Sequence, residues 1–424
     1  MEARVRRVLI VAAILSAGSA WAAGQTSEGI SKAPVGFEKR FPPVKKNAAA
    51  EDLEKLSLAL GLDSHPSDPA ADHPTTEDQD AYRQASIGTW LDAQVKTSED
   101  SIAAPPERLN AFLQERRVLL QRVVALLGKE VPEWGFDVHD VSKDHAYLLL
   151  VNNVGRILLS AALVEERGGR HAEAGELLEA SWSLSQCLSA HPVLIDKMIA
   201  VALGSRQAGV LRKMSEPGFE WVGRLASDSP RKQMLEQFRI DPLMAQSQAG
   251  RESEFYELER RMGNAFVDRA AEVSPCDLAK LPYEEIWRSV DVATESPEAA
   301  EQLRVIKEMA MPNLVSALYR AARLELDREL TGKVLSLRLE KAASRERKWP
   351  AKLFEPDSRV CPGAGYDYQA RSGGMLLRFQ GSTRDPEAPA LFLPLSFEAR
   401  VPRPTPTPTP SRPPRTATPP RPPS

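Results

Sequence analysis

Cysteine, histidine and aromatic residues are scarce in this chain, and its charges nearly cancel. The 424 residues include 3 cysteines and 6 histidines, and aromatic residues make up 6%. No two cysteines have the C-x-x-C spacing, so the usual zinc and redox motifs are missing. The 55 basic and 58 acidic residues leave a net charge of -3, which provides no overall positive field to attract nucleic acid.

The chain also lacks the local motifs of common enzymes. It contains no G-x-S-x-G elbow, no H-E-x-x-H pair, no G-x-x-x-x-G-K-[ST] loop, no G-x-G-x-x-G turn and no EF-hand loop. Hydrolase, metalloprotease, nucleotide and calcium chemistries therefore have no local signature here, and no cofactor is expected. A catalytic site assembled from distant segments stays open, because such sites are recognised by their geometry.

The composition that remains is that of an ordinary globular protein. Hydrophobic residues make up 42% of the chain and charged residues 27%, which argues against a disordered or fibrous chain. The length allows two or three domains.

The first 22 residues have the order of a signal peptide. Three arginines precede an apolar run from Val8 to Leu15, and Ala20-Trp21-Ala22 has the A-x-A form of a cleavage site. The apolar stretch, about 16 residues, is shorter than the roughly 20 needed to span a bilayer as a helix. Cleavage after Ala22 is therefore expected, and an uncleaved signal anchor is the alternative.

No later segment is expected to span a membrane. The most apolar one, Ala146 to Val164, is interrupted by Asn152, Asn153 and Arg156. The mature protein is therefore expected to be exported, to the periplasm or the extracellular space, without a transmembrane span.

Amphipathic segments separated by proline and glycine predict helices throughout residues 47–348. Residues 143–167 are nearly apolar around the circumference, which indicates a central helix covered by others. Short connections at Gly168-Gly169 and His191-Pro192 predict antiparallel neighbours. The expected helices are 47–61, 76–95, 105–128, 143–167, 171–189, 193–214, helices within 231–263, 282–290, and 296–348 with a kink at Pro312. The fold class is thus mainly α, with irregular antiparallel hairpins arranged as a bundle or a solenoid.

After Trp349-Pro350 the spacing of apolar residues is no longer helical and becomes strand-like. Residues 366–370 and 375–380 predict an antiparallel β-hairpin, and 391–397 predict a third strand, which Pro394 confines to an edge. The last 24 residues hold 11 prolines, several arginines and no acid, so they are expected to be disordered. The expected organisation is a signal peptide 1–22, an extended segment 23–46, a helical domain 47–348, a β-containing segment 349–398 and a tail 399–424.

One polar cluster is the densest set of side chains that could bind a metal or act as acid and base. Asp137, His139, Asp140, Asp144 and His145 lie within nine positions. They could hold a divalent ion or provide a carboxylate-oriented imidazole for proton transfer. The alternative is structural, because acids beside the predicted cap Ser142 complement the helix dipole.

Arg156, with Asn152 and Asn153, lies in the most apolar predicted helix. A buried charge is costly unless it is paired. The sequence therefore offers two interpretations: a ligand-binding arginine at the base of a groove, or an ion pair between helices. Acids nearby in sequence could supply that pair; they are Glu165, Glu173, Glu176 and Glu179.

Export would permit disulfides. Cys276 and Cys361 both stand beside prolines in predicted loops, and their pairing is a candidate. Cys187 lies on a helical stripe with Leu184 and Leu188, which favours a buried thiol.

Two stretches carry resemblances. Residues 168–174 and the helix that follows them, up to Pro192, resemble tetratricopeptide-type helical hairpins in the spacing of small residues. Residues 345–353, with Cys361-Pro362-Gly363 and the hairpin, are similar to the end of pseudopilin-like segments. Over about residues 40 to 385 the chain also resembles a group of exported, mostly helical bacterial proteins of uncharacterised role. The resemblance implies an exported helical fold and supplies no activity.

These observations favour an exported, non-catalytic helical binding or scaffold protein of the cell envelope, with a protein or an envelope polymer as partner. One alternative is an envelope hydrolase that uses the region of His139, Asp140 and His145. Another is an accessory role in secretion.

Overall fold

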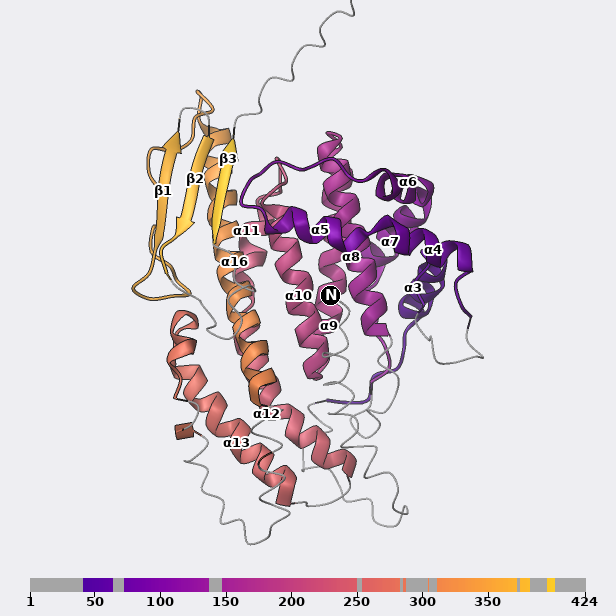
Figure 1. The fold of residues 1–424 in the computed structure, drawn as a ribbon, viewed down its shortest axis with the longest axis vertical. Helices are drawn as coiled ribbons and strands as arrows, with labels where there is room; N and C mark the ends of the chain where they lie inside the picture. Colours follow the sequence, from indigo (N-terminus) through magenta and orange to yellow (C-terminus); the bar gives the residue numbers. More distant parts are fainter. Residues whose placement is uncertain are drawn as a thin grey trace, which may run out of the picture.

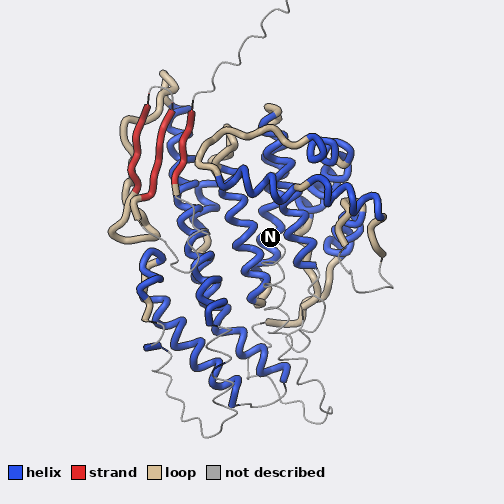
Figure 2. The backbone as a smooth tube through the Cα atoms, viewed as in Figure 1, coloured by secondary structure: helices blue, strands red, loops and turns tan. Residues whose placement is uncertain are grey.

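The computed structural model describes residues 41–63, 72–136, 147–249, 254–282, 285–286, 304, 311–371, 374–381 and 395–400. Within these ranges the protein is mainly helical and ends in a small antiparallel sheet (Figure 1). The colouring by secondary structure in Figure 2 shows the sheet beside the helices, at one edge of the molecule. The fold class expected from the sequence is confirmed.

Five short helices form the amino-terminal part of the described chain. Asn47 begins the first of them as expected: its side chain accepts a 2.9 Å hydrogen bond from the backbone N–H of Ala50. The helices are α3 (Ala48–Leu58), α4 (Thr76–Ala85), α5 (Ile87–Lys96), α6 (Glu107–Glu115) and α7 (Arg117–Lys129).

Two helices predicted as continuous are each divided in the structure. Ser86 has a left-handed φ of 51° and separates α4 from α5. Arg116 separates α6 from α7; its guanidinium donates a 2.8 Å bond to Asp78 and lies over the ring of Phe112. Neither break carries proline or glycine, so the apolar period crosses both without interruption.

Three long helices follow as antiparallel neighbours. They are α8 (Tyr147–Arg167), α9 (His171–Ala190) and α10 (Leu194–Leu211). Gly169, with φ of 76°, ends the turn between α8 and α9, where its N–H binds the carbonyl of Glu166.

Helix α8 is the central, covered element that its sequence predicts. By length and composition it is the one helix of the described residues that could cross a membrane, and 72% of its most apolar window is buried inside the protein. Its apolar side chains belong to the core shared by α3 to α11.

Helix α16 (Met311–Ala343) links the three largest clusters of the core. Its 33 residues correspond to about 50 Å of helix. Leu318 packs in one cluster with Phe266, Leu330 in a second with Met375, and Leu335 reaches the core around α8. Further helical elements in the described ranges are α11 (Glu220–Ser227), α12 (Pro230–Ala249), α13 (Glu254–Glu272) and the short η1 (Pro275–Lys280). Figure 1 shows α12 and α13 below the sheet, beside one end of α16.

The sheet has the order β1-β2-β3 and packs on the second half of α16. Its strands are β1 (Tyr366–Arg371), β2 (Gly374–Phe379) and β3 (Ser396–Arg400). The third strand is an edge strand, as expected, but it runs to Arg400 beyond the predicted end at Phe397. Its outer side is covered, because the N–H of Glu398 donates a 2.8 Å bond to the carbonyl of Ser98.

Candidate functional site

The predicted acid and histidine cluster lies outside the described residues. Asp137, His139, Asp140, Asp144 and His145 fall within 137–146, so their metal or acid-base role stays a prediction. Among the residues that are described, no group of three or more histidine, cysteine or acidic side chains could hold a metal ion.

The described chain stops at Phe136 and resumes at Tyr147, and both residues contact His191. The His191 ring centroid lies 6.0 Å from that of Phe136 and 6.2 Å from that of Tyr147. Tyr147 also stacks on Trp134, with centroids 5.0 Å apart. Aromatic rings therefore enclose His191 from two directions.

His191 belongs to a buried hydrogen-bonded cluster that joins three helical segments. Its Nδ1 lies 3.0 Å from Oδ2 of Asp196, and the Tyr147 hydroxyl donates a 3.0 Å bond to the same oxygen. Asp196 is fully buried, and its Oδ1 has no partner in the described part of the chain. Burial, together with the charge of Asp196, raises the pKa of Tyr147. The cluster fixes α8 against the start of α10.

A pocket of about 230 Å³ opens beside this cluster. Burial and the nearby charge of Asp196 raise the pKa of the Cys187 thiol on the pocket wall, which favours the protonated form. The thiol donates a 2.8 Å bond to the carbonyl of Leu184. The pocket is lined by Phe41, Pro42, Val44, Val131, Glu133, Phe136, Gln186, Cys187, His191 and Pro192.

A second histidine, His171, lies with a serine and an acid in an arrangement that is structural. Its Nδ1 is 2.9 Å from Oε2 of Glu166 and 3.3 Å from Oγ of Ser215. In a nucleophilic triad the acid and the serine contact opposite ring nitrogens. Here both contact Nδ1, and the Ser215 hydroxyl donates directly to Glu166, so the imidazole does not relay a proton between them.

Arg156 is held at the crossing of α5 and α8, next to Arg206 of α10. Its Nε is buried and has no hydrogen-bond partner among the described residues. Burial and the like charge of Arg206 lower the pKa of Arg156, and Tyr82 and Asp92 partly offset the effect. Asn152 and Asn153 lie one turn earlier on the same half-buried face of α8.

The acids expected beside Arg156 do not pair with it. Glu165 binds Arg170, and Glu179 binds Arg224. The nearest acid that acts on it, Asp92, accepts a 2.9 Å bond from Nε of Arg206. The ion-pair interpretation with Glu165 or Glu179 is therefore wrong, because those carboxylates are bound elsewhere.

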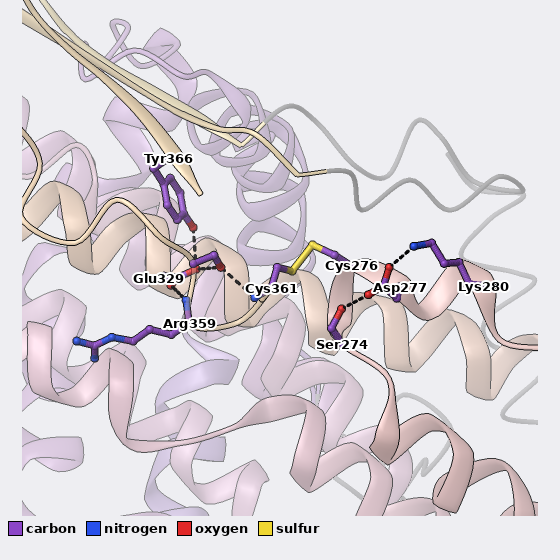
Figure 3. The surroundings of a disulfide bond; sticks show 9 residues. Ser274, Cys276, Asp277, Lys280, Glu329, Arg359, Cys361 and Tyr366 are labelled. Carbon is purple, nitrogen blue, oxygen red and sulfur yellow. Dashed lines mark hydrogen bonds and ion pairs between the residues drawn. A yellow bond between two sulfur atoms is a disulfide. The ribbon is translucent and has the colours of Figure 1, made fainter. Parts of the chain in front are cut away.

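The cysteine pair considered from the sequence is bonded in the structure. Cys276 and Cys361 form a disulfide across 85 positions, with Cα atoms 5.7 Å apart, while Cys187 is a buried free thiol. Figure 3 shows that this bond joins the η1 region to the segment before β1.

Beside the disulfide, Glu329 of α16 holds the same segment through several hydrogen bonds (Figure 3). It accepts bonds from the Ser358 hydroxyl at 2.6 Å, the Arg359 N–H at 2.6 Å and the Tyr366 hydroxyl at 3.0 Å. The carboxyl-terminal sheet is thus fastened to the helices covalently and by a half-buried acid.

Sequence reasoning did not find the His191–Asp196 pair. His191 was interpreted only as part of a turn, although an acid in the first turn of the following helix was a usable signal. Comparison with family models, curated proteins and solved structures gave no match to this chain.

Proposed function

We propose that this chain is an exported helical binding protein of the cell envelope that does not transform what it binds. Two features support export: the arginine, apolar run and A-x-A order of residues 1–22, and the Cys276–Cys361 disulfide. Disulfides persist mainly in oxidising compartments outside the cytoplasm.

Arg156 carries the proposal that the protein binds a ligand. Among the described residues its half-buried guanidinium has no acid of its own, whereas the described histidines and the free thiol are each bonded to another group. His191 is bonded to Asp196, His171 to Glu166, and the Cys187 thiol to a backbone carbonyl. Groups committed in this way hold helices together and are not free for catalysis.

The binding role is tested by retention on envelope material. The full chain is expressed with its leader in a bacterium, purified from the envelope fraction and sedimented with envelope fragments. Retention is expected for the wild type and expected to be lost in Arg156→Met. The control is Arg122→Met, which removes one exposed arginine from α7 and should leave retention unchanged. Equal retention of both variants would contradict the proposal.

A further inference from the structure

We infer that Arg156, together with Asn152 and Asn153, binds a carboxylate group of the ligand. This inference rests on the proposed binding role and names the chemistry that the site recognises. Arg156 and Asn152 are four positions apart on α8, and Asn153 is three positions from Arg156, so the three side chains are neighbours on one face.

The first step is the local charge. Arg156 and Arg206 act on each other as like charges, and Asp92 is the acid that acts on Arg156. Because Asp92 is hydrogen-bonded to Arg206, one carboxylate serves two guanidinium groups. An excess positive charge that is partly removed from water attracts an anion.

The second step is the position of the guanidinium. A Cβ atom placed on Gly88 would lie 1.2 Å from Nη2 of Arg156, so the guanidinium lies against the backbone of α5, in the space that a side chain at position 88 would fill. Any other residue at position 88 would therefore displace the guanidinium.

The third step is the match to the ligand. A guanidinium offers parallel N–H donors with the geometry of a carboxylate, and the two asparagines add amide donors. In the described part of the chain, no hydrogen bond or ion pair holds the amides of Asn152 and Asn153 or the terminal nitrogens of Arg156. The carboxylate could come from a free carboxylic acid or from the carboxyl terminus of a peptide.

The test measures Kd by ligand-observed NMR at constant ionic strength. The probes are acetate, N-acetyl-alanyl-alanine and the carboxamide of that dipeptide. Both acids should bind the purified wild-type chain, and the carboxamide should bind at least tenfold more weakly than its acid. Peptide binding at least tenfold tighter than acetate identifies a peptide terminus as the ligand, whereas equal binding identifies a free carboxylate.

Two variants probe the arginine in different ways. Arg156→Met removes the guanidinium, and Gly88→Ala keeps it but displaces it; each should weaken acid binding at least tenfold. The matched control is Gly175→Ala on α9, where an added Cβ meets nothing within 4 Å, and it should bind as the wild type does. Circular dichroism verifies that all the variants are folded.

Unchanged acid binding in folded Arg156→Met or Gly88→Ala would overturn the inference, as would equal binding of the carboxamide. A wild-type chain that binds neither acid, while its envelope retention still depends on Arg156, would overturn the carboxylate and leave the binding role standing. The two proposals can therefore fail separately.

Discussion

Glu166 of α8 accepts a 2.8 Å hydrogen bond from the backbone N–H of Ser215, 49 positions further along the chain. The same carboxylate binds His171, so a single acid joins the end of α8, the start of α9 and the segment after α10. The helices are thus fastened at their ends as well as through their apolar faces.

This contact predicts a pH window of added stability. Burial alone would raise the pKa of Glu166, but bonds from Ser215 and His171 lower it overall, and Glu166 raises the pKa of His171. Because the pKa of Glu166 is lowered in the folded state, its ionisation stabilises the fold above about pH 4.3. This stabilisation is lost as the pH falls through the pKa of the folded state. Because the pKa of His171 is raised in the folded state, its protonation stabilises the fold below about pH 6.5. This stabilisation is lost as the pH rises through the pKa of the folded state.

The full contribution is therefore expected between about pH 4.3 and pH 6.5. Because His171 is partly exposed, the contact should contribute about 0.5 to 1 kcal/mol to the free energy of unfolding. Denaturant unfolding of wild type, His171→Ala, Glu166→Gln and the double variant gives the coupling energy at each pH. A coupling that grows steadily above pH 8 would contradict the assignment.

The disulfide should contribute a large part of the stability. Closing a loop across 85 positions corresponds to about 4.5 kcal/mol in the chain-entropy model. Cys276→Ser with Cys361→Ser should lower the free energy of unfolding by roughly that amount, and a reductant should then have no further effect. Cys187→Ala is the control, and the reductant should still destabilise it.

Helix α10 approaches α5 so closely that only glycine fits at position 209. An added Cβ there would lie 2.5 Å from Cβ of Val95, a stiff β-branched side chain. Gly209→Ala should therefore destabilise the protein by about 1 to 3 kcal/mol despite its higher helix propensity. Gly175→Ala, in open space on α9, should instead stabilise it by about 0.5 to 1 kcal/mol. Thermal unfolding of the two variants compares them, and an equal change in Tm would contradict the close contact.

The buried Asp196 depends on Tyr147 for one of its hydrogen bonds. Tyr147→Phe removes the donor of that 3.0 Å bond and keeps the stacking on Trp134. The loss should be about 1 to 3 kcal/mol, since the other oxygen of the carboxylate has no partner among the described residues. Urea unfolding measures this loss, and the matched Tyr82→Phe change removes a hydroxyl from a half-buried residue. A change below about 0.5 kcal/mol in Tyr147→Phe would show that the bond does not matter.

Most of the fold could be predicted from apolar periodicity, because each helix buries one stripe and α8 buries most of its residues. The breaks at Ser86 and Arg116 could not, since tertiary contacts impose them on segments with an unbroken period. For the site, sequence indicated that Arg156 was unusual within an apolar helix. The absence of a paired acid depends on which helices become neighbours, and the period of a single helix does not determine that.

Export into an oxidising compartment is the condition that the proposed role requires. Whether the chain is exported is decided by its intact mass, measured without reductant on the chain recovered from the envelope fraction. The expected mass corresponds to residues 23–424 with a Cys276–Cys361 bond and one free thiol at Cys187. Recovery of the uncleaved chain from the cytoplasm with three free thiols would contradict it.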